Sequence, residues 1–97
     1  MDPGFRPDAK TGWHLLRILA EALSNGLVHG RARNVAIELS ASRLRVVDDG
    51  IGFETEADRP GQRFGVVGMR ERAREIGADL LLRSQPGHGT EVVVVLP

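Results

Sequence analysis

Residues 34–48 restrict the fold more than any other part of the sequence, because two adjoining segments there alternate between apolar and polar side chains. The apolar residues stand two positions apart: Val35, Ile37 and Leu39 in the first segment, Leu44 and Val46 in the second. A two-residue link, Ala41-Ser42, joins them. This alternation predicts an antiparallel β-hairpin with one face toward a core. Asp48 shares the parity of the apolar side chains, so we expect its carboxylate to point toward the core as its strand ends, with Asp49 pointing away.

A helical pattern precedes the hairpin. Between about Gly12 and His29, many apolar residues fall within one arc when successive residues are placed about 100° apart. They are Leu15, Leu16, Leu19, Ala22, Leu23, Gly26 and Leu27. Glu21, Asn25 and His29 follow one another at helical spacing and predict a polar stripe along the edge of that arc. A ligand lying against the helix would meet this stripe, although a solvated helix edge explains the same residues.

A polar segment and a second helical pattern follow the hairpin. Residues 54–64 are polar and include Pro60 and Gly61, so we expect a loop there. A second helix is predicted to begin at Gly65 and to stop at Gly77. Its apolar stripe comprises Val66, Met69, Ala73 and Ile76.

The C-terminal part predicts a second pair of strands. Residues 80–84 and 90–96 flank the turn sequence PGHG at 86–89, and the run VVVVL predicts a strand that is covered on both faces. The order is therefore a helix, two strands, a loop, a helix and two strands. This order predicts an α/β two-layer sandwich, in which a mixed, mostly antiparallel sheet carries the helices on one face.

Composition excludes several classes of function. Lys and Arg together number 13, as do Asp and Glu, so the zero formal charge argues against a nucleic-acid partner. The absence of cysteine excludes disulfides, a thiolate nucleophile and cysteine-ligated metals. No apolar run approaches the roughly 20 residues that span a bilayer, and no signal-peptide core is present, so a cytoplasmic location without membrane insertion is expected. We expect one domain at 12–97, with 1–11 as a flexible tail or linker.

The sequence DDGIGF at 48–53 is the most specific local motif. Gly50 and Gly52 let the backbone approach a ligand where a Cβ would collide. A carboxylate aimed inward from Asp48 needs hydrogen-bond donors, and the exocyclic amine of a purine could supply one. A turn at the end of a strand explains the same residues, because Asp-Gly is common in turns.

Three further motifs could bind phosphates or a cation. Glycines at the start of the helix in GVVGMRERA, 65–73, expose N–H groups that favour a phosphate, although a simple loop-to-helix junction with Gly68 closely packed fits equally well. The amide oxygen of Asn25 suits Mg²⁺, and His29 could donate to a phosphate oxygen. The turn in PGHGT at 86–90 is typical of purely structural hairpins as well.

Four motifs in one order are more specific than any of them alone. EALSNGLVHG at 21–30, DDGIGF at 48–53, GVVGMRERA at 65–73 and GHGT at 87–90 together resemble the catalytic ATP-binding domain of sensor histidine kinases. The GMRERA-like box is similar to that of the nitrate-sensor and DesK-type subfamily. The wider superfamily includes DNA gyrase, the ninety-kilodalton heat-shock chaperone and MutL. The resemblance extends over residues 12–97.

This resemblance implies the Bergerat α/β sandwich with ATP between its helices. It implies that Asn25 coordinates Mg²⁺ and that His29 lies near the phosphates. Asp48 would accept a hydrogen bond from the adenine amine, and Thr90 would join it through a water. Glu21 is a candidate base or water-orienting residue. The other residues that the resemblance places at the nucleotide are Gly50, Gly52, Gly65, Val67, Gly68, Met69 and Gly89.

The sequence also departs from the family pattern. Val28 stands where the family usually has Lys or Arg, and Arg63 or Arg70 could compensate for that missing charge. No dimerisation helix pair or phosphoacceptor His-Asp motif is present, and the strand that often comes before the first helix could be lacking. We therefore expect a catalytic fragment that binds ATP and Mg²⁺, whose partners are a separate dimerisation domain carrying the histidine and a response regulator.

Two alternatives stay open at this point. One is a serine kinase of the anti-sigma-factor type that also acts as a binding module, because its first box can read much like EALSNGLVHG. The other is a degenerate regulatory domain that keeps the fold but binds no nucleotide.

Overall fold

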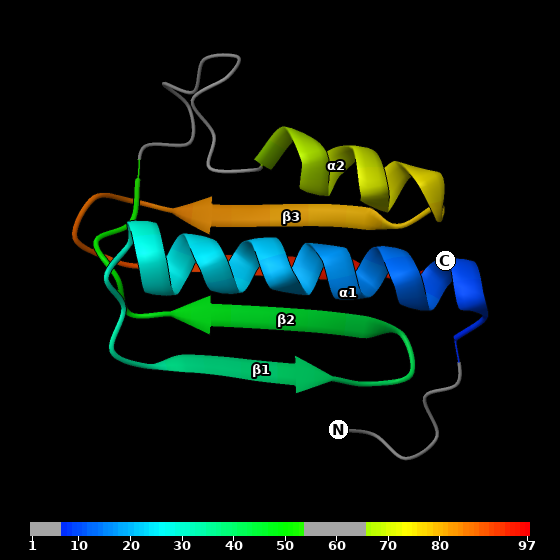
Figure 1. Cartoon of the computed structure of the whole chain (residues 1–97), viewed down its shortest axis with the longest axis horizontal. Coiled ribbons are helices and arrows are strands. Elements are labelled where there is room, and N and C mark those ends of the chain that lie inside the picture. The colour runs from blue at the N-terminus through cyan, green and yellow to red at the C-terminus, as the bar shows by residue number, and fades with distance from the viewer. Residues whose placement is uncertain (1–6, 54–65) are drawn as a thin grey trace.

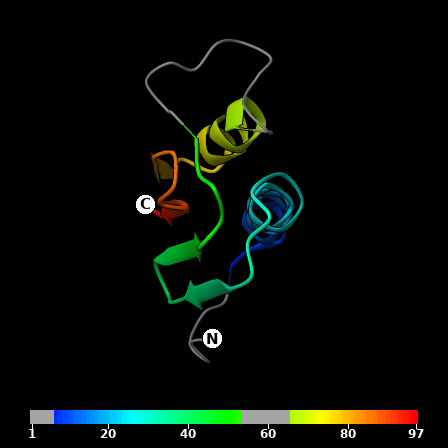
Figure 2. The same ribbon diagram turned by 90° about the vertical axis from the view of Figure 1, so that its left-hand side faces the viewer.

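The computed structural model describes residues 7–53 and 66–97. The elements in chain order are α1 (Ala9–Ser24), the π-helical turn η1 (Asn25–His29), β1 (Val35–Leu39), β2 (Arg43–Asp48), α2 (Val66–Glu75), β3 (Asp79–Ser84) and β4 (Thr90–Val95). The strands form one sheet in the order β1-β2-β4-β3, and every neighbouring pair is antiparallel. Both helices lie on one face of this sheet (Figure 1, Figure 2). The predicted two-layer α/β sandwich is confirmed, with no parallel pair among the described strands.

The first helix begins earlier than the sequence pattern predicted. It starts at Ala9 rather than Gly12, because the carboxylate of Asp8 accepts a hydrogen bond of 2.7 Å from the N–H of Thr11 and caps the helix. The same bond lowers the pKa of Asp8. Residues 9–11 are therefore helical and not part of a flexible tail. The division between a tail and a domain near residue 12 otherwise stays a prediction.

The core lies between the helices and the two central strands. Ile18 of α1, Met69 of α2, Val46 of β2 and Val94 of β4 are almost completely enclosed. The other buried apolar residues are Leu15, Ala22, Leu44, Val66, Ala73 and Val92. The two central strands, β2 and β4, each contribute every second residue to this layer, as the alternation predicted for β2.

Three apolar residues that the pattern placed inward are exposed. Leu16 is 64% exposed, Leu27 is 51% exposed and Ile37 is 48% exposed. Ile37 lies on β1, which is the edge strand, and α1 runs over the middle of the sheet instead (Figure 1). The helices therefore leave this edge partly uncovered, which a periodicity alone does not reveal.

The outer face of the sheet carries a row of alternating charges. Arg45 pairs with Glu38 on β1 and with Glu91 on β4, and the Nε of Arg45 lies 2.6 Å from Oε2 of Glu91. Arg83 on β3 extends the row, at 3.7 Å from Glu91. Ion pairs of this kind connect all four strands on the face away from the helices. The expectation that β4 is covered on both faces is wrong for the described residues: Val93, beside Arg45, is only half-buried.

The end of α2 was predicted correctly. Gly77 adopts a φ of +68°, its N–H donates to the carbonyl of Arg74 at 3.1 Å, and Ala78 donates to Ala73 at 2.9 Å. These two bonds form the Schellman motif, in which a glycine in the left-handed region closes a helix.

A comparison of two isoleucines tests this description of the core. Replacing Ile18 with Ala removes a fully enclosed side chain, so the free energy of unfolding should fall by about 2–5 kcal/mol. Ile37→Ala should cost less than about 1 kcal/mol, because the side chain is half in water already. Denaturant titrations would measure both values. Equal losses would contradict the placement of α1 over the central strands.

Candidate functional site

The site begins with a row of polar residues where the strands end. Asp48 on β2 is opposite Thr90 on β4, and Thr90 is opposite Ser84 on β3. All three side chains have the parity of the core-facing residues, and Asp48 is 8% exposed. The N–H of Gly50 donates to Oδ1 of Asp48 at 2.8 Å. The inward carboxylate that the sequence predicted is therefore present and buried.

The carboxylate of Asp48 lies directly against Gly26 in η1. A Cβ added to Gly26 would be 2.8 Å from Oδ2 of Asp48 and 3.0 Å from its Cβ, which is too close for any side chain. Sequence analysis placed Gly26 only in the apolar arc of the helix. The feature of the sequence that could have singled out Gly26 is its position inside a helix, where glycine lowers stability by about 1 kcal/mol relative to alanine.

The polar stripe on the first helix is not uniform. Asn25 is 8% exposed and its Oδ1 is a buried atom without a hydrogen-bond partner, whereas His29 is exposed and Glu21 is partly buried. These side chains differ in exposure because the helix ends in a π-helical turn, in which the N–H of Gly30 donates to the carbonyl of Asn25 at 2.7 Å. This wider turn changes the angle between successive side chains. A cavity of about 40 Å³ lies here, lined by Asn25, His29, Gly30, Ile51, Gly52, Phe53 and Thr90.

Two of the predicted glycines are required by backbone contacts within the chain. Gly52 has a φ of +67°, and a Cβ there would lie 2.1 Å from the carbonyl oxygen of Gln85. Gly89 has a φ of +71°, and a Cβ there would lie 2.1 Å from the carbonyl oxygen of Asp48. A Cβ added to Gly50 would likewise lie 2.6 Å from the carbonyl oxygen of Gly30. These glycines let the loop after β2 meet its neighbours and thereby shape the cavity.

The residues predicted on the second helix are placed differently from one another. Val67 is exposed, whereas Met69 is fully buried in the core, so only its backbone could face a ligand. A Cβ added to Gly68 would meet no atom of the described residues within 4 Å. The close packing considered for Gly68 is therefore not found against residues 7–53 and 66–97. Gly65 lies outside the described residues.

Asp49 holds the start of β1 against the end of β2. Its Oδ1 accepts hydrogen bonds from the N–H groups of Arg33 and Asn34 at 2.8 and 2.9 Å, and its Oδ2 accepts one from Nδ2 of Asn34 at 2.9 Å. The bonds from Asn34 are the main reason that the pKa of Asp49 lies below its ordinary value. Asp49 thus points away from Asp48, as predicted, and has a structural role.

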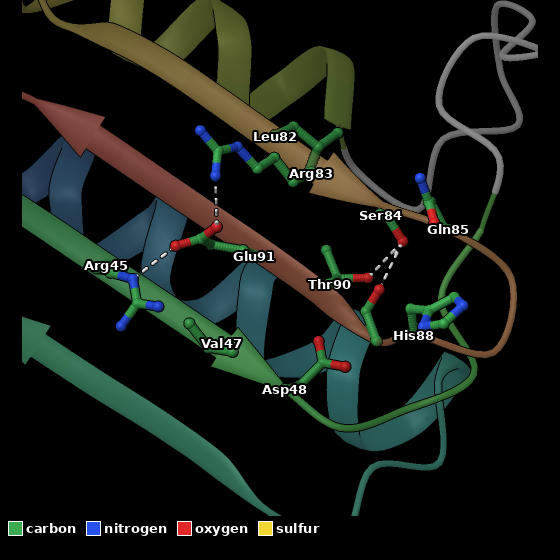
Figure 3. Close-up of a pocket in the computed structure, with 11 residues that line it drawn as sticks. Arg45, Val47, Asp48, Leu82, Arg83, Ser84, Gln85, His88, Thr90 and Glu91 are labelled. Atoms are coloured by element: carbon green, nitrogen blue, oxygen red, sulfur yellow. Dashed lines mark hydrogen bonds and ion pairs between the residues drawn. The ribbon is translucent and has the colours of Figure 1, made fainter.

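Sequence analysis missed Ser84. Its hydroxyl lies 2.8 Å from Oγ1 of Thr90 and 2.9 Å from the carbonyl oxygen of Gly89 (Figure 3). It also lies 2.8 Å from the backbone nitrogen of Phe53. The alternation along β3 could have indicated that Ser84 faces the core side, because it follows Leu80 and Leu82 at every second position. The register opposite Thr90 could only be known from the structure.

A larger open cavity of about 480 Å³ lies beside this row, among the residues drawn in Figure 3. Most of its charged side chains belong to the outer face of the sheet. Arg45, Arg83 and Glu91 are already engaged in the row of ion pairs. We therefore place the candidate ligand on the helix side, where Asp48, Thr90 and Asn25 meet.

The described residues contain no cluster of three or more His, Asp or Glu side chains that could hold a metal ion. A cation that keeps most of its waters and takes its negative ligands from phosphates needs little more than one neutral oxygen from the protein. The unpartnered Oδ1 of Asn25 fits that requirement. No described helix is long and apolar enough to cross a membrane.

The acceptor role of Asp49 predicts a pH dependence of stability. Because the pKa of Asp49 in the folded chain is below its ordinary value of 3.8, its stabilisation is complete above that value and is lost as the pH falls through the lower folded pKa. Asp49→Asn should therefore be less stable than wild type near about pH 7, and the two proteins should converge toward about pH 3. Denaturant titrations across this range would show it, and a constant difference would contradict it.

Known proteins resemble this chain over most of its length. The family model for the histidine kinase-, DNA gyrase B-, and HSP90-like ATPase, HATPase_c, matches residues 12–97. Sensor protein VraS of Staphylococcus saprophyticus is 43% identical over 88 residues, which cover 87% of this chain and 25% of that protein. VraS of Staphylococcus aureus is 41% identical over 88 residues, which again cover 87% of this chain and 25% of that protein. The chain thus spans about a quarter of the length of these curated relatives.

Solved structures agree with this result. The histidine kinase domain of the Erythrobacter litoralis EL346 blue-light activated histidine kinase matches with a TM-score of 0.70 and 24% identity, over 91% of this chain and 48% of that one, and shows the same fold. The ATP binding domain of PrrB from Mycobacterium tuberculosis matches with a TM-score of 0.69 and 25% identity, over 88% and 67%. The chain therefore belongs to the histidine kinase-, DNA gyrase B-, and HSP90-like ATPase family, as an ATP-binding catalytic domain of the sensor histidine kinase type.

Proposed function

We propose that the adenine of ATP binds beside Asp48 and Thr90. The observation that carries this proposal is the buried carboxylate of Asp48 at the end of β2, next to the Thr90 hydroxyl that lines the cavity under η1. A buried carboxylate favours a ligand that donates hydrogen bonds, and the adenine amine is such a donor. Gly50, Gly52 and Gly89 support this pocket through the backbone contacts described above.

The phosphates are proposed to lie between η1 and the first turn of α2. The N–H groups of a helix start are suited to anionic oxygens, and no described residue would lie within 4 Å of a Cβ at Gly68. Asn25 would hold Mg²⁺ through its unpartnered Oδ1, and bound Mg²⁺ would neutralise the charge that develops on the phosphates. His29, on the exposed side of η1, would contact a phosphate, as would the backbone at Gly65, Val67 and Met69.

In a longer parent protein, this domain would supply the γ-phosphoryl group of ATP to a histidine on a dimerisation domain, from which it passes to a response regulator. The similarity to VraS and to histidine kinase domains favours this reading over a serine kinase of the anti-sigma-factor type. The chain would position the nucleotide and neutralise the charge on its phosphates, and Glu21 is a candidate for orienting the attacking group. Because it would use ATP, the domain is proposed to lie in the cytoplasm.

Calorimetric titration of ATP, with and without Mg²⁺, tests the site directly. Asp48→Asn removes the charge while keeping the size of the side chain, and should weaken ATP binding by about 10- to 100-fold, because hydrogen bonds to charged groups contribute about 1.5–3 kcal/mol. Asp79→Asn, an exposed carboxylate at the start of β3, is the matched control and should bind like wild type. Asn25→Ala should lose most of the effect of Mg²⁺.

Three results would contradict the proposal. A folded wild type that shows no binding heat and no thermal stabilisation by ATP would indicate a degenerate domain. Equal affinities of wild type and Asp48→Asn would place the nucleotide elsewhere. Unchanged Mg²⁺ dependence in Asn25→Ala would remove Asn25 from the metal site.

Two glycine variants distinguish packing from ligand contact. Gly26→Ala pushes a Cβ against Asp48, so we expect it to lower both the free energy of unfolding, by about 1–3 kcal/mol, and the affinity for ATP. The Cβ of Gly68→Ala meets no described residue within 4 Å, so this variant should leave stability unchanged or raise it by up to about 1 kcal/mol. Its affinity for ATP should nevertheless fall about tenfold, because the new Cβ occupies the proposed phosphate space. Unaltered affinity in Gly68→Ala would exclude that space.

A further inference from the structure

The hydroxyl of Ser84 sits at the centre of three hydrogen bonds. The backbone N–H of Phe53 donates to it at 2.8 Å, the carbonyl oxygen of Gly89 accepts from it at 2.9 Å, and Oγ1 of Thr90 lies 2.8 Å away (Figure 3). Ser84 is not a residue that the proposed function uses. It joins the segment after β2 to the beginning of β4, beneath the proposed adenine pocket.

The direction of the bond between the two hydroxyls follows from the number of protons. A serine hydroxyl has one proton to donate and two lone pairs that accept. The carbonyl of Gly89 can only accept, so the proton of Ser84 is committed to it. The proton between Ser84 and Thr90 must then come from Thr90. Ser84 accepts from Thr90 and from Phe53, and its capacity is used completely.

This direction determines what Thr90 can offer to a ligand. Its proton points toward β3, so the cavity that it lines receives only its lone pairs. Asp48, its neighbour in the row, is acceptor-only when ionised. Asp48 and Thr90, which also both line the larger open cavity, therefore present two acceptors on neighbouring strands. A ligand group that donates fits them, whereas a carbonyl oxygen would face acceptors without a proton between them.

We propose that Ser84 is a positioning residue that makes the pocket select a purine with an exocyclic amine over one with a carbonyl at the same place, by fixing the hydroxyl of Thr90 as an acceptor. The inference rests on the proposed function, since it requires the base to lie beside Asp48 and Thr90. Sites that hydrogen-bond one polar group discriminate strongly against analogues that lack it, because their own polar atoms are left unpaired.

The test compares ATP with inosine triphosphate, in which a carbonyl replaces the amine. Calorimetric titrations of both nucleotides give the ratio of their dissociation constants for wild type, Ser84→Ala, Thr90→Val and the double variant. Wild type should prefer ATP. Ser84→Ala should reduce the preference about tenfold, because the freed proton of Thr90 can turn to a carbonyl. Because each ratio is measured on one protein, a change in the folded fraction cancels.

The remaining variants separate this role from a structural one. Ser84→Thr keeps a hydroxyl and should retain the wild-type ratio. Ser40→Ala, in the link between β1 and β2, removes a hydroxyl bonded to the carbonyl of Arg43 far from the row and should also retain it. In the Thr90→Val background, Ser84→Ala should cause no further change in the ratio, since its effect passes through the Thr90 hydroxyl.

Each contrary result has a distinct meaning. If Ser84→Ala weakens both nucleotides equally, Ser84 only holds the backbone and the inference is overturned. A change in the ratio that persists in the Thr90→Val background overturns it as well, because the effect would then come through Phe53. Equal binding of both nucleotides by wild type shows that no such selection exists. If wild type binds neither nucleotide, the proposed function itself fails.

Discussion

The antiparallel pairing of β4 with both of its neighbours is the interaction on which the candidate site depends. It places Asp48, Thr90 and Ser84 opposite one another on three strands, at the end of a face that is otherwise apolar. Each strand alone would end in one polar residue with nothing to bind. In register, the three form one row of polar side chains at the end of the apolar core, and Ser84 and Thr90 are hydrogen-bonded within it. The core and the site are thus two parts of one surface.

Around this edge, the chain comes close to itself at glycines. Gly26 brings η1 against Asp48, and Gly89 and Gly52 bring the two loops after β2 and β3 into backbone contact. Bonds from the N–H of Ile51 to the carbonyl of Gly30, at 2.9 Å, and from Gly87 to Ile51, at 2.6 Å, fasten these segments together. The segments around Asp48 are therefore held together by contacts within the chain, and such order reduces the conformational entropy that binding must remove.

The sequence was sufficient to predict the elements, because period and turn chemistry are local. The hairpin parity that turned Asp48 inward and the stop at Gly77 needed no knowledge of distant residues. The features that could not be predicted depend on contacts between residues far apart in the sequence. The role of Ser84 appears only when β3 is aligned with β4, and the exposure of Ile37 depends on where α1 crosses the sheet. The π-helical turn at Asn25 was also hidden, since a single wide turn leaves no repeat in the pattern.

The register of β3 and β4 has a consequence for how this chain can vary in length. The turn between them, at 85–89, is tied to Ile51 through Gly87 and closed by a bond from His88 to Gln85. One residue inserted or deleted within either strand would send Ser84 and Thr90 to opposite faces of the sheet, because side chains alternate with a period of two. Homologous proteins should therefore conserve the length of this hairpin even where its side chains differ, so gaps in an alignment should avoid it.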